Sequence, residues 1–192
     1  KIPGLDNILF TSTEANENNR PQLIVPKKIS LASPIQSLSF EFVCLDGNGE
    51  ASYMTDWKNS SYAQSISFIG CAVQNIKRTL VRIGDGSGVF MTDITIDNCI
   101  ISEVGTDGYG MINFGKNIDQ LEKISITNST LINMGDQLMD LKGGIGDVTL
   151  ENCTFYNSMD AKKELPKVFR FDNAASTPPS PKSATMRNLI FS

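Results

Sequence analysis

Four charged residues in two short apolar segments are the best candidates for chemistry in this sequence. Asp140 and Lys142 alternate with apolar residues in MDLK, and Arg170 and Asp172 do the same in FRFD. If these segments are neighbouring strands, the four side chains form a square with corners about 5–7 Å apart. The square can bind a sugar chain, or it can consist of two plain ion pairs. Those pairs would join Asp140 to Arg170 and Lys142 to Asp172.

The charges of this square limit its chemistry. Calcium prefers several carboxylates without cations among them, so the alternating signs disfavour calcium. One aspartate beside one arginine also lacks the separated acid and base of a glycoside hydrolase. Exposed pairs of opposite charge are common and contribute little stability. We therefore assign no catalytic residue and expect no cofactor. The candidates for catalysis, polysaccharide binding or simple ion pairing remain Asp140, Lys142, Arg170 and Asp172.

Two further polar residues have the same surroundings as the charged ones. Arg82 lies between apolar residues in VRI and Asn113 in INF, as Asp140 does in MDL. The next outward positions are Gly84 and Gly115. Arg82 and Asn113 would therefore extend a sugar-binding groove beyond the square.

Three aromatic residues in a polar segment form a second candidate site. Tyr53, Trp57 and Tyr62 lie in SYMTDWKNSSYAQ, which we expect to be a loop. Exposed aromatic rings can stack on the faces of sugars, which predicts glycan binding here. The alternative is that Trp57 packs over the end of the core, because large aromatic side chains bury most of their surface.

A repeat must position these residues, and the sequence contains one. Four segments share a pattern in which apolar residues alternate, the period of a β-strand, and a fifth copy stops at the end of the chain. The pattern aligns equivalent residues in columns without gaps. The segments are ISFIGCAVQN (66–75), ITIDNCIISE (94–103), ISITNSTLIN (124–133), VTLENCTFYN (148–157) and ATMRNLIFS (184–192).

The alternation skips one position in the middle of each copy, which indicates a sharp corner. The corner column reads Gly70, Asn98, Asn128, Asn152 and Asn188, and asparagine tolerates the left-handed conformation that such a corner needs. We expect the asparagines to stack as a ladder that satisfies the polar groups of a buried corner. The next column, with Cys71, Cys99 and Cys153, predicts buried thiols in preference to a metal site or a disulfide.

A third pair of apolar residues follows each copy after a variable loop, so the repeat unit has three short strands. These pairs are Val81–Ile83, Ile112–Phe114, Met139–Leu141 and Phe169–Phe171. No amphipathic helix of normal length is visible. The sequence therefore predicts an all-β fold, a right-handed parallel β-helix of about five coils, stacked about 4.8 Å apart.

The corner asparagines with their neighbouring aliphatic and cysteine columns resemble the pectate-lyase-like superfamily of parallel β-helices. The copies are similar to β-helix domains of surface lipoproteins from Gram-negative gut bacteria, commonly encoded beside polysaccharide-uptake machinery. The resemblance covers residues 66–192. It implies a polysaccharide along the third strands and an outer-membrane or other cell-surface location. In that superfamily, aspartate clusters hold calcium against substrate carboxylates and an arginine or lysine acts as the base.

The two ends of the chain fit the repeat less well. We expect residues 1–37 to form an irregular N-terminal cap and loop, and residues 38–192 to form the β-helix. Leu38, Phe40 and Phe42 alternate like its first strand. Because the last coil stops at Ser192 without a visible cap, we expect further chain or a partner to cover it.

Composition excludes several classes of function. The chain of 192 residues has 17 Lys and Arg against 21 Asp and Glu, which disfavours nucleic-acid binding. It has no histidine, which removes His-based triads and His-containing zinc sites. No apolar run is long enough to cross a bilayer. We expect a non-catalytic polysaccharide-binding domain, with a polysaccharide lyase or glycoside hydrolase, or a structural spacer, as alternatives.

Overall fold

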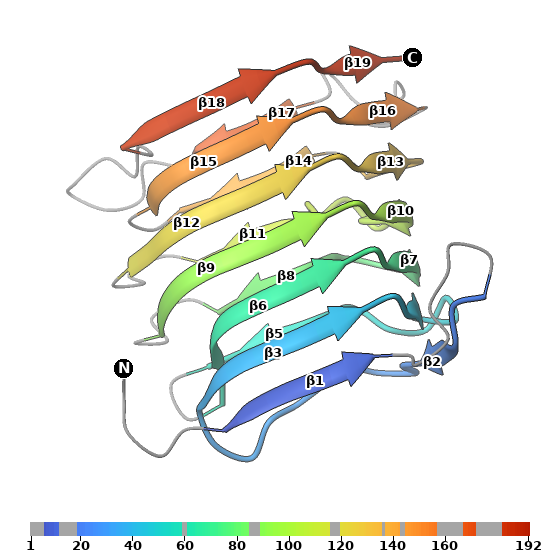
Figure 1. The fold of residues 1–192 in the computed structure, drawn as a ribbon, viewed down its shortest axis with the longest axis vertical. Helices are drawn as coiled ribbons and strands as arrows, with labels where there is room; N and C mark the ends of the chain where they lie inside the picture. The colour runs from blue at the N-terminus through green and yellow to red at the C-terminus, as the bar shows by residue number, and fades with distance from the viewer. Residues whose placement is uncertain are drawn as a thin grey trace.

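The chain forms a parallel β-solenoid of about five turns, consistent with the right-handed parallel β-helix that the sequence predicts (Figure 1). The computed structural model describes residues 6–11, 19–58, 61–84, 89–115, 120–135, 137–142, 145–156, 167–171 and 182–192. Of residues 120 and 167–171 it describes the backbone. All regular structure in this part of the chain is β-strand, and it contains no helix that is long and apolar enough to cross a membrane.

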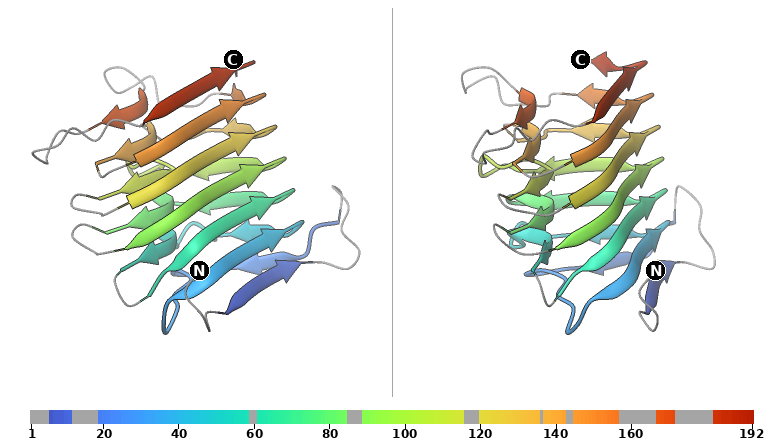
Figure 2. Two further views of the ribbon diagram at one scale, coloured as in Figure 1. Left: turned by 60° about the vertical axis from the view of Figure 1, so that its left-hand side comes forward. Right: turned by 90° about the vertical axis from the view of Figure 1, so that its left-hand side faces the viewer.

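The strands form three parallel sheets, one on each side of the solenoid (Figure 2). Sheet A contains β1 (Asn7–Thr11), β3 (Ile35–Glu41), β6 (Ala63–Ile69), β9 (Phe90–Asp97), β12 (Gln120–Thr127), β15 (Ile145–Glu151) and β18 (Ser183–Arg187). Sheet B contains β2 (Gln22–Ile24), β4 (Cys44–Asp46), β7 (Ala72–Ile76), β10 (Ile100–Val104), β13 (Thr130–Ile132), β16 (Thr154–Tyr156) and β19 (Ile190–Phe191). Sheet C contains β5 (Tyr53–Trp57), β8 (Thr79–Ile83), β11 (Ile112–Phe114), β14 (Gln137–Leu141) and β17 (Lys167–Phe171).

The strand register confirms the columns read from the sequence. On sheet A, Ile94 pairs with Ile66 on one side and with Ile124 on the other. Because parallel strands in register place equivalent side chains above one another, the apolar columns become continuous rows inside the solenoid. The rings of Phe10, Phe40 and Phe68 stack in this way, with centroids 5.1 and 5.4 Å apart.

The asparagine corners follow the strands of sheet A, and their backbone is left-handed as expected. The φ angles are 53° at Asn98, 50° at Asn128, 55° at Asn152 and 52° at Asn188. Asn188 donates to Asn152 at 2.9 Å, and Asn152 donates to Asn128 at 3.0 Å. The ladder therefore exists, but the prediction of a buried corner is wrong, because all these side chains are exposed.

Below Asn128 the ladder changes partner. Asn128 donates to the carboxylate of Asp97 at 2.8 Å, one residue before Asn98. One coil further down, Gly70 takes the corner position with φ of 60°, and the ring of Phe42 lies where a side chain at Gly70 would be. Phe42 is itself a corner residue with φ of 54°, so it does not continue strand β3 as the sequence suggested.

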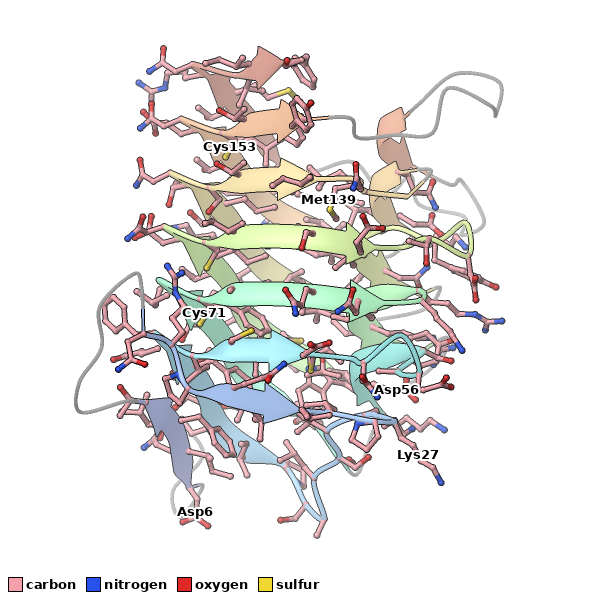
Figure 3. The ribbon with its side chains drawn as sticks, turned by 90° about the vertical axis from the view of Figure 1, so that its right-hand side faces the viewer. Asp6, Lys27, Asp56, Cys71, Met139 and Cys153 are labelled. Carbon is pink, nitrogen blue, oxygen red and sulfur yellow. The ribbon has the colours of Figure 1, made fainter. Side chains whose placement is uncertain are left out.

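The cysteine column lies inside the solenoid, as predicted. Cys71, Cys99 and Cys153 are at most 2% exposed, and all are free thiols. Each thiol contacts the backbone carbonyl two residues earlier, at 3.3–3.4 Å. Figure 3 shows Cys71 and Cys153 in one line along the stack. These thiols thus help to satisfy the carbonyls of the turn while they fill the core.

The segment expected to be an irregular cap contributes to all three sheets. Strand β1 pairs with β3, β2 pairs with β4, and Ile29 forms a bridge with Thr55 of sheet C. The side chain of Arg20 fastens this segment by donating to the carbonyl of Gly70 at 2.7 Å. The segment is therefore a first, loosely built coil, added in the same direction as the others.

The asparagine ladder can be tested by separating backbone strain from hydrogen bonding at Asn152. We expect Asn152→Ala to lower the free energy of unfolding by about 1–3 kcal/mol, because alanine loses the ladder bonds and resists positive φ. Asn152→Gly loses the same bonds without the strain, so it should retain about 1 kcal/mol more stability. Denaturant unfolding measures both values. Equal loss in the two variants would show that the left-handed backbone is not the constraint.

Candidate functional site

The outer face of sheet C carries the polar row that the sequence indicated. Strand pairing places Arg82 beside Asn113, Asn113 beside Asp140, and Asp140 beside Arg170. The row has one further member, because Asp56 of β5 pairs with Arg82. The resulting row of Asp56, Arg82, Asn113, Asp140 and Arg170 has one side chain per coil, at a spacing of about 4.8 Å.

Among the described side chains, Lys142 and Asn113 hold Asp140. Its carboxylate pairs with the ammonium of Lys142, the residue directly after β14, at 3.0 Å, and accepts a hydrogen bond from the amide of Asn113 at 3.1 Å. Asp140 is 3% exposed, so this ion pair is largely removed from water. Arg170 is placed by its backbone alone, and Asp172 lies outside the described residues. The structure therefore brings together Asn113, Asp140 and Lys142, and the pairing of Asp140 with Arg170 and of Lys142 with Asp172 stays a prediction.

Asp56, labelled in Figure 3, lies at the N-terminal end of the row and forms a second ion cluster there. Arg82 donates to one carboxylate oxygen at 2.6 Å and Lys28 donates to the other at 2.8 Å. Burial opposes ionisation of Asp56, but the hydrogen bonds and charges of Lys28 and Arg82 outweigh it and lower the pKa of this carboxyl. The cluster carries two cations for one carboxylate, which leaves a positive charge on this part of the face.

Arginine and tyrosine side chains alternate beside Asp56. The name Tyr–Arg run is used below for these four residues, which are Tyr53, Arg78, Arg82 and Tyr109. The guanidinium of Arg82 lies 5.1 Å from the ring centre of Tyr53. The hydroxyl of Tyr53 accepts a hydrogen bond from Arg78 at 3.2 Å, and the guanidinium of Arg78 lies 4.8 Å from the ring centre of Tyr109. Cation–π contacts hold flat groups in fixed orientations. The run is therefore an ordered strip of ring faces and hydrogen-bond donors.

Two of the three aromatic candidates are unable to reach a sugar. Trp57 is fully buried in β5 and Tyr62 is 9% exposed, so both belong to the core. The expectation of a loop was wrong here, because residues 53–57 form strand β5. The sequence hides this strand, since Thr55 takes an inward position where the other coils have an apolar residue. Its hydroxyl donates to the carbonyl of Leu80 at 3.1 Å, which allows a polar residue in the core. Tyr53 alone of the three is half-exposed.

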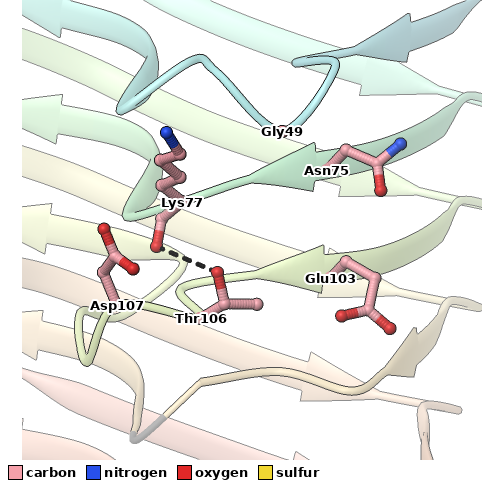
Figure 4. A pocket seen from close by; sticks show the side chains of 6 residues that line it. All are labelled: Gly49, Asn75, Lys77, Glu103, Thr106 and Asp107. Carbon is pink, nitrogen blue, oxygen red and sulfur yellow. Dashed lines mark hydrogen bonds between the residues drawn. The ribbon is translucent and has the colours of Figure 1, made fainter.

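A hollow of about 320 Å³ lies at the second corner of the coil, between sheets B and C (Figure 4). Apart from Gly49, the residues that line it have polar side chains, and they come from successive coils. Thr106 and Asp107 bind the Lys77 carbonyl there, through a hydroxyl at 3.5 Å and an N–H at 2.8 Å. The lining residues are Gly49, Asn75, Lys77, Glu103, Thr106 and Asp107.

Asp46 supports one wall of this hollow. Its buried carboxylate accepts hydrogen bonds from Gln22 and Gln74, both at 2.8 Å, from Asn75 at 2.9 Å and from the N–H of Asn48 at 2.7 Å. Burial opposes ionisation of Asp46, but these donors together lower its pKa below the ordinary value. Asn75, which lines the hollow, is thus held in place by a charged acceptor.

Within the described parts of the chain, no three Cys, Asp or Glu side chains are grouped so that they could hold a metal ion.

Residues 10–134 match a family described as a domain of unknown function (DUF4957). The chain belongs to this family. The match contains the whole Tyr–Arg run and the hollow, whereas Asp140 and Lys142 lie beyond it. A search of the curated proteins and a search of the solved structures each gave no match.

Sequence reasoning missed several residues of this DUF4957 chain. Asp56 escaped because Thr55 and Trp57 do not form the aliphatic pair that marks the other third strands. Arg78 and Tyr109 lie in the turns before third strands, where loop lengths differ between coils, so no column contains them. A useful signal was present in the spacing, since Asp56 lies 26 residues before Arg82, close to one coil.

The wall built on Asp46 predicts a pH-dependent stability. A carboxyl whose pKa is lowered by folding stabilises the protein above its unfolded pKa of about 3.9, and this contribution is lost as the pH falls through the folded pKa. We expect Asp46→Asn to destabilise the protein by about 1–3 kcal/mol at pH 7. The difference from the parent chain should shrink below about pH 4.

Thermal and denaturant unfolding at several pH values measure this difference. The matched control is Glu122→Gln, because Glu122 is an exposed carboxylate on sheet A. A difference between Asp46→Asn and the parent chain that stayed constant from pH 7 to pH 3 would contradict the role given to the Asp46 charge.

Proposed function

We propose that this chain is a non-catalytic polysaccharide-binding domain and that the polysaccharide binds to the outer face of sheet C. The observation that carries the proposal is the Tyr–Arg run. Tyr53 and Tyr109 offer ring faces for the apolar faces of sugars, and Arg78 and Arg82 offer donors for sugar hydroxyls beside them. Because cation–π contacts fix these side chains in advance, little conformational entropy is lost when a glycan binds.

The flat outer face suits a chain-like ligand. The polar row continues from the Tyr–Arg run to Asn113, Asp140 and Lys142 without a change of register. A polysaccharide lying along the solenoid axis would meet a polar side chain at each coil. We propose that Asn113 and Lys142, both held by the buried carboxylate of Asp140, contact the same glycan further along its length, and that Arg170 and Asp172 extend the contact.

The positions of the carboxylates favour binding over hydrolysis. Asp56 and Asp140 are three coils apart in the row, which is roughly 14 Å. A glycoside hydrolase needs its two carboxylates about 5–9.5 Å apart. Each of these aspartates is also bound to a cation, at 2.6–3.0 Å. Within the described side chains, Asp56 and Asp140 are thus held by ion pairs and do not form an acid and base pair.

The cell-surface location and the superfamily suggested by the sequence belong to the same proposal. A glycan-binding solenoid fits a bacterial cell surface, where long polysaccharides are captured before uptake. We propose a surface location, as in an outer-membrane lipoprotein, and kinship with the pectate-lyase-like superfamily. The support for both is the ladder of asparagine corners and the polar face of the third sheet.

Affinity electrophoresis through gels that contain single polysaccharides tests the proposed function. We expect at least one polysaccharide to retard the chain, and Tyr53→Ala to weaken binding about tenfold or more, because loss of an aromatic anchor typically removes ~2 kcal/mol. Tyr109→Ala should have a smaller effect in the same direction.

The matched control is Tyr156→Ala, since Tyr156 is 56% exposed on sheet B, away from the Tyr–Arg run. Thermal unfolding of each variant shows whether it has folded. If no polysaccharide retards the parent chain, the proposed binding function is wrong and the alternative of a structural spacer takes its place. If Tyr53→Ala and Tyr109→Ala migrate like the parent chain, the glycan site lies elsewhere.

A further inference from the structure

The hollow at the second corner has polar groups of the kind that bind sugar hydroxyls. Lys77 supplies an ammonium, Thr106 a hydroxyl, and Glu103 and Asp107 supply carboxylates (Figure 4). A sugar hydroxyl both donates and accepts, so it needs donors and acceptors together. The volume of about 320 Å³ lies at the lower end of the range for small-ligand sites. One sugar ring is therefore the natural size of occupant.

Two polar groups of the hollow, the ammonium of Lys77 and the hydroxyl of Thr106, are only weakly engaged by the protein. The ammonium of Lys77 lies 3.4 Å from Glu50, and both side chains are more than a third exposed. The hydroxyl of Thr106 lies 3.5 Å from the carbonyl that it contacts. Both distances are at the outer limit of a hydrogen bond. A ligand can therefore replace these contacts at little cost.

The charge of the hollow selects the class of sugar. Lys77 is the single cation of the lining, against the carboxylates of Glu103 and Asp107. Glu50 adds a third carboxylate beside Lys77. The excess of negative charge disfavours uronic acids and sulfated sugars and leaves neutral sugars as the class that fits.

The hollow adjoins the Tyr–Arg run through two short chain segments. Lys77 lines the hollow, and the next residue, Arg78, stacks on Tyr109. Asp107 lines the hollow, and Tyr109 follows two residues later. Since neighbouring Cα atoms are about 3.8 Å apart, the two sites are within reach of linked sugar residues.

From this arrangement we infer that the hollow binds a neutral sugar residue joined to the glycan on the Tyr–Arg run, as a side branch or as the chain end. The inference rests on the proposed function and adds the class of glycan, one with neutral branches or ends. The Tyr–Arg run then holds the main chain, and the hollow selects which substituted chains bind.

Amide chemical shifts of the ¹⁵N-labelled full chain test the hollow directly. The probes are the methyl glycosides of glucose, galactose, mannose, xylose, arabinose and fucose, with glucuronic acid as the anionic comparison. We expect at least one neutral sugar to shift the amides of Gly49, Thr106 and Asp107, and glucuronic acid to leave them unchanged. Absence of shifts at these amides for every neutral sugar, or equal shifts with glucuronic acid, would overturn the inference.

Variants of the lining connect these shifts to the named groups. Asp107→Ala and Lys77→Ala each remove one polar group and should weaken binding of the shifting sugar about tenfold. The control is Glu122→Ala, an exposed carboxylate on sheet A, which should bind as the parent chain does. Unchanged binding in both lining variants would contradict the assigned site.

The two experiments separate the inference from the proposed function. Retardation by a polysaccharide that depends on Tyr53, without sugar shifts in the hollow, upholds the proposed function and overturns the inference. Sugar shifts in the hollow without retardation by any polysaccharide overturn the proposed function and leave a site for free sugars.

Discussion

The left-handed corner after each strand of sheet A is the constraint on which the rest of the structure depends. It lets the chain leave one sheet and enter the next within about two residues, and it occurs at the same place in every coil from Phe42 to Asn188. Because the corner is fixed, the strands on both sides of it keep their register. Apolar side chains then stack in continuous rows inside, and polar side chains stack in rows outside. The core and the candidate site are thus two consequences of one repeated turn.

The same constraint explains why the outer faces differ so much. The core rows must be apolar in every coil, whereas the outward position between two core residues is free to vary. On sheet C this position holds Asp56, Arg82, Asn113 and Asp140 in successive coils. Each carboxylate in the row acquires a cation, Arg82 for Asp56 and Lys142 for Asp140. The ion pairs hold the outer side chains in place, so that a regular scaffold presents a rigid polar surface.

How much the sequence predicts depends on whether a residue lies in a column. The inward pairs such as Ile112 and Phe114, the cysteine column and the row through Arg82 and Asn113 were predicted correctly, because period and corner fix them. Trp57 was assigned to a loop because the polar Thr55 interrupts the apolar pattern of its strand. The hydroxyl of Thr55 donates to the carbonyl of Leu80, a tertiary contact that the local sequence does not reveal. Arg78 and Tyr109 lie in turns of unequal length, so their meeting depends on how two loops fold over each other. No local pattern encodes that contact.

The backbone at the second corner offers an independent argument about the hollow. Asn75 and Asn133 occupy this corner in their coils with φ of 59° and 50°, as asparagine readily does. Between them the same position holds Glu103 with φ of 53°, although a residue of this kind resists that conformation by about 1 kcal/mol. Its carboxylate receives a hydrogen bond from Asn133 and lines the hollow. An asparagine would complete the corner with less strain, so the turn itself does not call for a carboxylate. Under the proposal for the hollow, the carboxylate that Asn133 holds at this corner is an oriented, charged acceptor for the hydroxyls of a neutral sugar.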